Sequence, residues 1–454
     1  MYSYGGDSAV YGLKYGGRCI VAQGSPRNMD DTNNEAKEEK TISNSDSDND
    51  SDLGKASKHY FLLGTTSLSE SNEIHQVEYN EDLNELRCTA IFGHQDEVWH
   101  MAPNPTNSSL LCTIHTSSGK GSNAKVGRKV STLWQFPSEL APEDSPLKVM
   151  PLEKVCDVPG SSQFDTVDFV WDTHGANRCM SVARDGLRMM SLEGSGSSSS
   201  FNVENTILRG ENSTSFLTGF SHGRWDPHHR NEISASSGGN VFGYDLRISN
   251  DGGESQRSHT ISKAHSQMIY DIDYNPNKPY CLMTCGDDCL IRFWDLRMAS
   301  SSSSSSTTTS STKPIAVLRN HTHWVRSCKY NPFHDQLVLS GGSDAAVDLW
   351  RISSISSAPL LEIDGEDVSD GSDGSDDGDR SDSDGGDSPK SNKHRRSGET
   401  TLDTLITRFD EAHEESVNSV AWSLAEAWTF ASLSHDGRMV VNTVPSAEKY
   451  KILL

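Results

Sequence analysis

Short segments that alternate between apolar and polar residues recur along this chain of 454 residues. Examples are "YDIDYN" (270–275), "LVLSGG" (337–342), "AVDLW" (346–350) and "SVAW" (419–422). Alternation with a period of two places successive side chains on opposite faces of the backbone, as in a β-strand. The segments are bounded by Asn-Pro, Gly-Gly or Asp-Gly pairs, which favour turns. The pattern therefore predicts an all-β chain built from many short strands.

These strands are organised in a repeat. Segments 264–297 and 320–352 share four residues at a constant offset of 56 positions. The matched pairs are His265 and His321, Pro276 and Pro332, Asp288 and Asp344, and Trp294 and Trp350. A third copy begins at Ala412 and keeps the histidine and the aspartate, but Asn442 replaces the tryptophan. A unit of about 40 residues with four short strands, a His near its start and Trp-Asp near its end is typical of a WD-type propeller blade.

Weaker copies upstream extend the array to seven units, a common number for a closed propeller. The expected blades span residues 9–92, 93–159, 164–210, 216–263, 264–319, 320–410 and 411–454. The first blade would begin with "AVYGLKY" (9–15), and the terminal "KYKILL" (449–454) could form the outer strand of the last. In many propellers that outer strand comes from the N-terminus, and the sequence leaves both arrangements open. We therefore predict one seven-bladed WD-repeat β-propeller.

Charge is concentrated in inserts between the strands. The chain carries a net charge of −24, and segments 30–52 and 364–387 contribute −7 and −10 of it. Segments with little apolar surface and high charge cannot offset their chain entropy by burial, so inserts 25–57, 301–312 and 364–400 are predicted to be disordered. The remainder is mildly acidic and has no cluster of lysines and arginines for phosphate contacts. We expect no nucleic-acid partner.

No run of 18 apolar residues and no secretory signal are found, so membrane insertion is not expected. Nine cysteines with mostly irregular spacing favour a reducing compartment over a disulfide framework. Cys281, Cys285 and Cys289 are equally spaced and invite a metal-site interpretation. Four residues along a strand span about 13 Å, too far for two thiolates at about 2.3 Å from one zinc. We predict no metal and no cofactor.

The repeats resemble the WD-repeat family, and this resemblance implies a hydrogen-bonded chain inside each blade. It joins a loop histidine, a strand serine or threonine, a turn aspartate and a strand tryptophan. By position, these residues are His265, Thr284, Asp288 and Trp294; His321, Ser340, Asp344 and Trp350; and, in truncated form, His413, Ser432 and Asp436. Because these groups repeat in successive blades, a structural role is favoured over a hydrolase triad.

The resemblance extends beyond generic repeats. The segments "HQDEVWH" (94–100), "GRWDPHH" (223–229), "HTHWVRSCKYN" (321–331) and "WTFASLSHDGR" (428–438) are similar to the EARP- and GARP-interacting WD-repeat protein family. The resemblance implies a non-enzymatic cytoplasmic adaptor for tethering complexes of endosomes and the trans-Golgi network. Such an adaptor would support endosomal recycling, retrograde transport and secretory-granule traffic. It would be monomeric before assembly and would reach membranes only through its partners.

The same resemblance places candidate partner-binding residues at the start of the first strand of a blade. The residue before the first-strand valine faces the loop surface in this family. That position holds Trp324, with Glu97, Met268 and Ser416 in the equivalent places. His100 and Ser327, two residues after the valine, are secondary candidates. An exposed tryptophan on a rigid face is a good anchor for a partner.

Two other functions stay open at the level of sequence. Trp294, Asp295 and Arg297 form a WDxR box of the kind that substrate receptors of cullin-RING ubiquitin ligases use, although this arginine could equally bond around the Trp-Asp turn. Acidic inserts would also suit a histone-binding WD-repeat protein.

Overall fold

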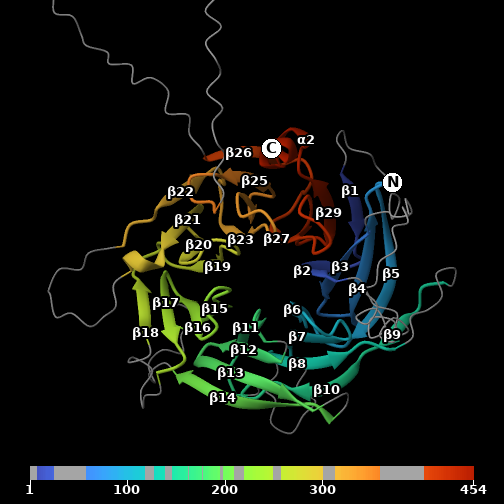
Figure 1. Ribbon diagram of the computed structural model, residues 1–454. Coiled ribbons are helices and arrows are strands. Elements are labelled where there is room, and N and C mark those ends of the chain that lie inside the picture. The colour runs from blue at the N-terminus through green and yellow to red at the C-terminus, as the bar shows by residue number, and fades with distance from the viewer. Residues whose placement is uncertain are drawn as a thin grey trace, which may run out of the picture.

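The computed structural model describes residues 8–24, 58–117, 127–138, 146–161, 163–175, 177–194, 198–208, 219–248, 257–299, 312–357 and 403–453. Within these ranges, the strands form seven sheets that stand around a central axis (Figure 1). The predicted all-β, seven-bladed propeller is confirmed. Inserts 25–57 and 364–400, and all of 301–312 except its last residue, lie outside the described residues.

Each blade has four antiparallel strands, and the strand named first for each blade below lies nearest the axis (Figure 1). Blade 1 contains β2 (Gly16–Gln23), β3 (Lys58–Thr66), β4 (Asn72–Asn80) and β5 (Glu85–His94), with β9 (Val149–Pro151) added in parallel. Blade 2 contains β6 (Val98–Pro103), β7 (Leu110–Thr116), β8 (Lys129–Gln135) and β10 (Glu153–Asp157). Blade 3 contains β11 (Thr166–Trp171), β12 (Arg178–Ala183), β13 (Gly186–Glu193) and β14 (Ser200–Leu208).

The second half of the ring follows the same order. Blade 4 contains β15 (Phe220–Trp225), β16 (Glu232–Ser237), β17 (Asn240–Asp245) and β18 (Arg257–Ile261). Blade 5 contains β19 (Ile269–Tyr274), β20 (Cys281–Gly286), β21 (Leu290–Asp295) and β22 (Ala316–Arg319), with a short 3₁₀ helix η3 (Leu296–Met298). Blade 6 contains β23 (Val325–Tyr330), β24 (Leu337–Gly342), β25 (Val347–Ile352) and β26 (Asp403–Phe409). Blade 7 contains β27 (Val417–Trp422), β28 (Thr429–Ser434), β29 (Arg438–Thr443) and β1 (Ala9–Gly12).

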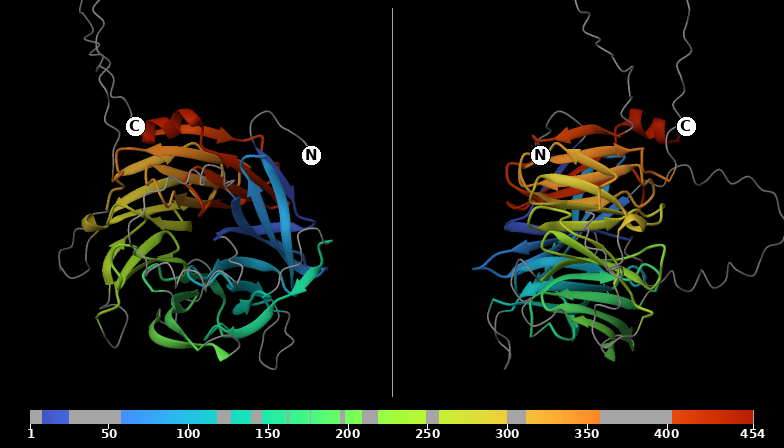
Figure 2. Two further views of the ribbon diagram at one scale, coloured as in Figure 1. Left: turned by 45° about the vertical axis from the view of Figure 1, so that its right-hand side comes forward. Right: turned by 90° about the vertical axis from the view of Figure 1, so that its left-hand side faces the viewer.

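The ring is closed by its N-terminal strand. Strand β1, which the sequence analysis assigned to blade 1, pairs antiparallel with β29 and is the outer strand of blade 7. The alternative closure by residues 449–454 is wrong, because this region belongs to helix α2 (Ser446–Leu453). Pro445 directly precedes α2, and a proline is well suited to the start of a helix. This helix lies at the rim in both views of Figure 2, and within the described residues no helix is long and apolar enough to cross a membrane.

A second departure concerns β9. Residues 149–151 were expected in blade 2, but they pair in parallel with Ile91–Gly93 at the outer edge of blade 1. The segment is only three residues long, so its pattern could not specify which neighbouring edge it would join.

The hydrophobic core lies between neighbouring blades. All six residues of β20, of β24 and of β28 are buried, because these strands pair on both sides within a blade and are covered on both faces by neighbouring blades. At the seam of the ring, Phe61 and Tyr79 of blade 1 pack in one cluster with Leu433 and Val441 of blade 7. Ala9 of β1 belongs to the same cluster, so apolar packing as well as backbone pairing joins the two ends of the array.

One irregularity repeats in every blade. The pairing of each innermost strand with the next strand shifts register by one residue near its start. A β-bulge of this kind leaves one extra residue unpaired and re-aims its side chain. The bulged residues are Arg18, Trp99, Val167, Ser221, Tyr270, Arg326 and Asn418, and we refer to them as the bulge ring.

Candidate functional site

The bulge ring lines a cavity of about 740 Å³ on the axis of the propeller. All seven bulged residues border it, so every blade contributes one side chain at an equivalent height. This size lies within the range of pockets that hold small ligands or peptide side chains. The cavity is therefore built by the repeat itself.

Basic side chains concentrate along this cavity. We define the cationic mouth as Arg18, Lys129, Arg184 and Arg326, which all border it. Two of them contact the indole of Trp99, with the Arg18 guanidinium 4.1 Å and the Lys129 Nζ 3.7 Å from its ring centroid. Burial, followed by the charges of Arg18 and Arg184, lowers the pKa of Lys129 to about 8. Such crowding of like charges favours a negatively charged partner.

Two carboxylates temper this charge. The charges of Asp165 and Glu97 act to raise the pKa of Lys129, against the effect of its basic neighbours. Glu97 acts in the same direction on the pKa of Arg18. Glu97 is already engaged, since its Oε2 accepts a hydrogen bond from Thr116 Oγ1 at 3.0 Å. Four cations against two acids leave the mouth basic.

Trp324 lies beside this mouth and reaches solvent. Its side chain is 43% exposed, and its ring centroid lies 4.9 Å from that of His323 and 5.8 Å from that of Tyr270. The guanidinium of Arg326 lies 4.9 Å from the same Tyr270 ring. Aromatic and basic side chains thus form a continuous surface from Trp324 to the cavity.

The four residues expected on the partner face do occupy equivalent backbone positions. In each case the backbone oxygen accepts a hydrogen bond from the amide 19 residues later. These pairs are Glu97 with Thr116, Met268 with Asp287, Trp324 with Ser343, and Ser416 with His435, at 2.8–3.2 Å. The loop before the first strand is therefore fixed to the following turn in four blades, and only the side chain varies.

The side chains at these positions differ in exposure. Met268 is buried but borders the axial cavity, while Glu97 and Ser416 are half-buried, and the place of these residues on a partner face stays a prediction. Ser327 is also buried, donates to Asp271 and borders the same cavity. His100 lines the cavity, with Nε2 3.4 Å from Asp168. The period-two pattern did not single out the residue directly after the valine, such as Trp99 or Arg326, because the bulge turns that residue toward the axis.

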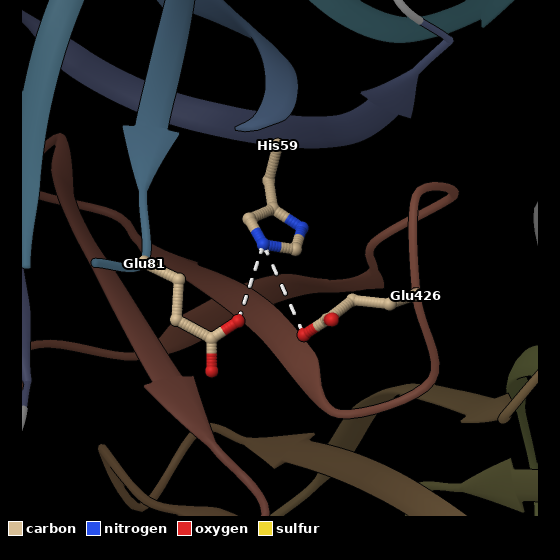
Figure 3. A group of neighbouring side chains, drawn as sticks. All are labelled: His59, Glu81 and Glu426. Carbon is tan, nitrogen blue, oxygen red and sulfur yellow. Dashed lines mark ion pairs between the residues drawn. The ribbon is translucent and has the colours of Figure 1, made fainter. Parts of the chain in front are cut away.

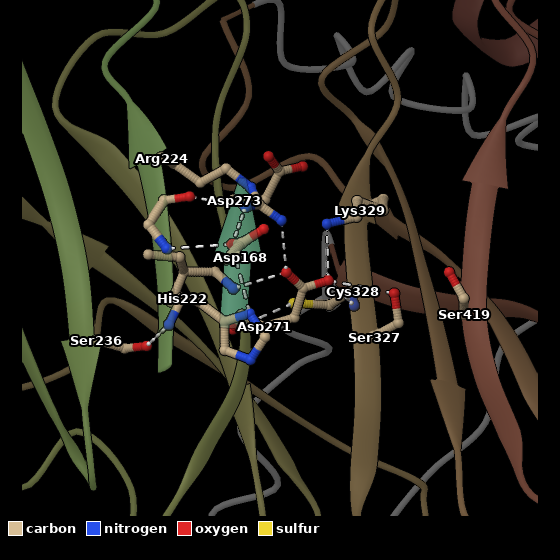
Figure 4. Close-up of polar contacts among 12 residues, drawn as sticks. Asp168, His222, Arg224, Ser236, Asp271, Asp273, Ser327, Cys328, Lys329 and Ser419 are labelled. Atoms are coloured by element: carbon tan, nitrogen blue, oxygen red, sulfur yellow. Dashed lines mark hydrogen bonds and ion pairs between the residues drawn. The ribbon is translucent and has the colours of Figure 1, made fainter. Parts of the chain in front are cut away.

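A network of charges crosses four innermost strands at the cavity wall (Figure 4). Arg224 of β15 donates to Asp168 of β11 at 2.8 Å and to Asp271 of β19 at 3.0 Å. Lys329 of β23 lies 2.7 Å from the other oxygen of Asp271. Backbone amides complete the set, since Gly223 donates to Asp168. The network joins blades 3, 4, 5 and 6.

Two carboxylates of this network are held in their charged form by the basic groups. Burial alone would raise the pKa of Asp168, but Arg224 and His100 hold it well below its ordinary value. Burial would also raise the pKa of Asp271, but Lys329 and Arg224 lower it. Burial raises the pKa of the neighbouring Asp273. Because Asp168 and Asp271 already accept bonds from several donors, the arrangement suits cohesion between blades better than proton transfer.

The blade networks implied by the WD-repeat resemblance are hydrogen-bonded in blades 5 and 6. In blade 5, Trp294 Nε1 donates to Thr284 Oγ1 at 2.9 Å, and that oxygen lies 2.8 Å from His265 Nε2. The other ring nitrogen, Nδ1, lies 2.7 Å from Asp288. Blade 6 repeats these contacts through Trp350, Ser340, His321 and Asp344 at 2.9–3.1 Å, taking the nearer carboxylate oxygen.

Blade 7 differs from the expected arrangement. His413 Nε2 lies 2.7 Å from Ser432 Oγ, but Nδ1 contacts Ser434 Oγ at 2.9 Å, and it is Ser434 that donates to Asp436. The turn aspartate is thus reached through a second serine.

Blade 2 has a network that the sequence analysis did not include. Trp134 Nε1 donates to Thr113 Oγ1 at 2.8 Å, and His94 Nε2 lies 3.2 Å from the same oxygen. The backbone oxygen of Asp96 takes the place of the turn aspartate. The Gly-His start and the tryptophan of this segment were the available signal.

The WDxR box is paired within itself. Arg297 donates from Nε and from a terminal nitrogen to the two oxygens of Asp295 at 2.9 and 2.6 Å, and its guanidinium lies 5.6 Å from the Tyr280 ring centroid. Trp294 is buried. Arg247 and Asp245 repeat this fork in blade 4. The pairing explains the motif by local structure, and a role in binding stays a prediction.

The three equally spaced cysteines occupy the predicted strand and turn. Cys281 and Cys285 are buried in β20, and Cys289 lies in the next turn with a backbone φ of 62°. Ala345 in blade 6 has the same conformation, with φ of 59°, as expected from the repeat alignment. The spacing of these cysteines therefore follows from the blade geometry.

The sequence is similar to those of known proteins. Residues 38–350 match the family model described as "EIPR1 beta-propeller". The chain is 34% identical to "EARP and GARP complex-interacting protein 1" of Homo sapiens over 87% of this chain and 92% of that protein. It is 32% identical to "EARP-interacting protein homolog" of Gekko japonicus over the same shares, and 27% identical to "WD repeat-containing protein DWA2" of Arabidopsis thaliana over 97% of each chain. From the extent of these matches, the chain belongs to the EIPR1 β-propeller family.

Proposed function

We propose that this chain is a non-enzymatic adaptor that binds tethering complexes of the EARP and GARP type. The names of its relatives, which describe proteins that interact with these complexes, support the proposal. Through these partners it would support endosomal recycling, retrograde transport and secretory-granule traffic. It would act in the cytoplasm, monomeric before assembly, and reach endosomes and the trans-Golgi network by association with its partners.

The exposed and immobilised Trp324 is the observation that carries the choice of binding surface. Its ring contacts His323 and Tyr270, and its backbone oxygen accepts a hydrogen bond from Ser343 at 2.8 Å. A large aromatic side chain that is already ordered loses little conformational entropy when a partner covers it. Such residues commonly dominate the binding energy of an interface.

The neighbouring charge indicates what kind of segment would bind there. Arg326 and the rest of the cationic mouth continue the surface from Trp324 toward the axis. A partner segment with an apolar side chain followed by acidic residues would match both parts. Opposite charges would also speed the encounter and make binding sensitive to salt.

Affinity isolation tests the proposal. Tagged chain would be recovered from cells and its partners identified by mass spectrometry, with tether subunits as the expected result. Trp324→Ala should weaken their binding by about 30-fold, which corresponds to loss of about 2 kcal/mol at a typical aromatic anchor.

Phe333→Ala is a matched control. Phe333 is 45% exposed and lies in the same blade, but it follows β23 whereas Trp324 precedes it, so the two mark opposite ends of that strand. Equal losses with both variants would contradict the proposed face. Recovery of a cullin adaptor or of histones in place of tether subunits would refute the adaptor role and favour the corresponding alternative. Asp344→Ala should instead damage blade 6, which thermal unfolding would reveal.

A further inference from the structure

A histidine and two glutamates meet where blade 1 adjoins blade 7 (Figure 3). His59 lies in β3 and Glu81 directly follows β4, so both belong to blade 1. Glu426 lies between β27 and β28 of blade 7. One potential ligand atom from each side chain lies within 4.8 Å of the others.

The imidazole of His59 distinguishes this group from an ordinary acidic cluster. Its side chain is fully buried, and its Nδ1 is held by Ser423 Oγ at 2.7 Å. Its Nε2 has no hydrogen-bond partner among the described residues. This atom points between the carboxylates, 3.8 Å from Glu81 and 3.9 Å from Glu426 (Figure 3). Both distances are too long for hydrogen bonds, so a buried nitrogen is aimed at two oxygens without bonding to either.

These distances suit a metal ion between the three atoms. Zinc binds imidazole nitrogen at about 2.0–2.1 Å and carboxylate oxygen at about 2.0–2.2 Å, so two donors of one tetrahedral ion lie about 3.4 Å apart. Each carboxylate oxygen would need to approach the imidazole by about 0.4–0.5 Å. Both glutamates are partly exposed, at 31% and 26%, and can make that adjustment. Ser423 meanwhile fixes the ring, as outer-shell partners of metal-binding histidines do.

One basic side chain competes for these carboxylates. Lys449 lies 3.9 Å from the second oxygen of Glu81 and is the nearest competing cation in the described chain.

A second cluster lacks these properties. Asp226, His229 and Glu232 are also close enough to share an ion. There, however, the His229 Nδ1 already lies 3.1 Å from Asp226, which also accepts two backbone amides. This second group is satisfied by its own hydrogen bonds and provides a control.

We propose that His59, Glu81 and Glu426 form a divalent transition-metal site, with zinc as the preferred ion. A solvent molecule would complete the coordination on the exposed side of the carboxylates. The bound ion would cross-link the first and last blades of the ring. Calcium and magnesium should bind poorly, because they prefer sites made entirely of oxygen ligands.

Calorimetric titration of Zn²⁺ into the EDTA-treated full chain tests the proposal. We expect one ion per chain and a rise in Tm that saturates with it. His59→Gln and Glu426→Gln should each weaken this binding at least tenfold, and Lys449→Met should strengthen it. His229→Gln is the matched control and should leave the affinity unchanged. Glu426→Gln changes a partly exposed side chain and keeps the test valid if the buried His59 variant fails to fold.

X-ray absorption spectroscopy of the zinc-loaded chain identifies the ligands. Light N/O donors at about 2.0–2.1 Å, with a histidine scattering pattern, would support the site. Sulfur in the first shell would assign the ion to cysteines and overturn the proposal. Absence of binding at 100 μM Zn²⁺ (about 100 times a micromolar Kd), or equal binding by the wild type and the Glu426 variant, would overturn it as well.

Discussion

Replacing Thr284 with valine removes the central hydroxyl of the blade 5 network and nearly preserves the shape of the side chain. The Thr284 oxygen accepts from Trp294 Nε1 at 2.9 Å and lies 2.8 Å from His265 Nε2. Trp294 and His265 are each only 2% exposed, so water cannot take the place of the hydroxyl. A buried polar group left without a partner costs about 1–3 kcal/mol. With two such groups, and about 1 kcal/mol recovered from the added methyl, we expect a destabilisation of about 1–5 kcal/mol.

Urea denaturation of the wild type and of the Thr284→Val and Thr284→Ser variants would measure this effect. The serine variant keeps the hydroxyl and loses one methyl, for which about 1 kcal/mol is expected. A shift of the midpoint with an unchanged slope reports stability without a change in the unfolding reaction. If the valine variant is no less stable than the serine variant, the hydrogen-bonded chain does not stabilise the blade and the reasoning is refuted.

Three further predictions follow from the structure. Burial lowers the pKa of His413 to about 4, so the unfolded chain binds a proton there at higher pH than the folded chain does. The folded state should therefore lose up to about 3 kcal/mol of stability as pH falls from about 6.5 to about 4, and a His413→Gln variant that loses as much over that window would contradict this. Arg224→Met leaves Asp168 without its main counter-charge and should lower the free energy of unfolding, measured by denaturant titration, by about 3–5 kcal/mol. The loss should be smaller when Asp168→Asn is introduced as well, because the buried carboxylate is then removed. Removing residues 1–12 deletes the outer strand of blade 7 and should lower Tm and promote association, measured by calorimetry and light scattering; a monomer with unchanged Tm would contradict the observed closure.

The parts of the fold that the sequence predicts are those encoded within one blade. The alternation of strands and the His-Ser/Thr-Asp-Trp spacing are local, so the blade 5 and blade 6 networks could be placed by alignment alone. In blade 7, Ser434 stands between His413 and Asp436, and the residue spacing of the other blades does not predict this arrangement. It occurs in the blade where Asn442 replaces the tryptophan. A local pattern could not show how the remaining groups rearrange.

The features that the sequence did not predict depend on contacts between blades. Arg224 reaches Asp168 and Asp271 across 56 and 47 positions, and no periodicity links these residues before the blades are assembled. The bulge ring was missed because a one-residue register shift is invisible in a strict period-two reading. Strand β1 is only four residues long, too short for its pattern to select one sheet edge over another.

Closure by β1 has a consequence for how the chain is made. Ala9–Gly12 are synthesised before all the other described strands, whereas their partners on β29, Arg438–Val441, are synthesised after all of the others. Until then, the nascent ring stays open and β29 has not yet arrived to accept the first strand. Contacts between such distant parts of a chain form slowly, and an unpaired strand edge invites association with other chains. Closure of this propeller therefore waits until its last strand, β29, pairs with its first, β1.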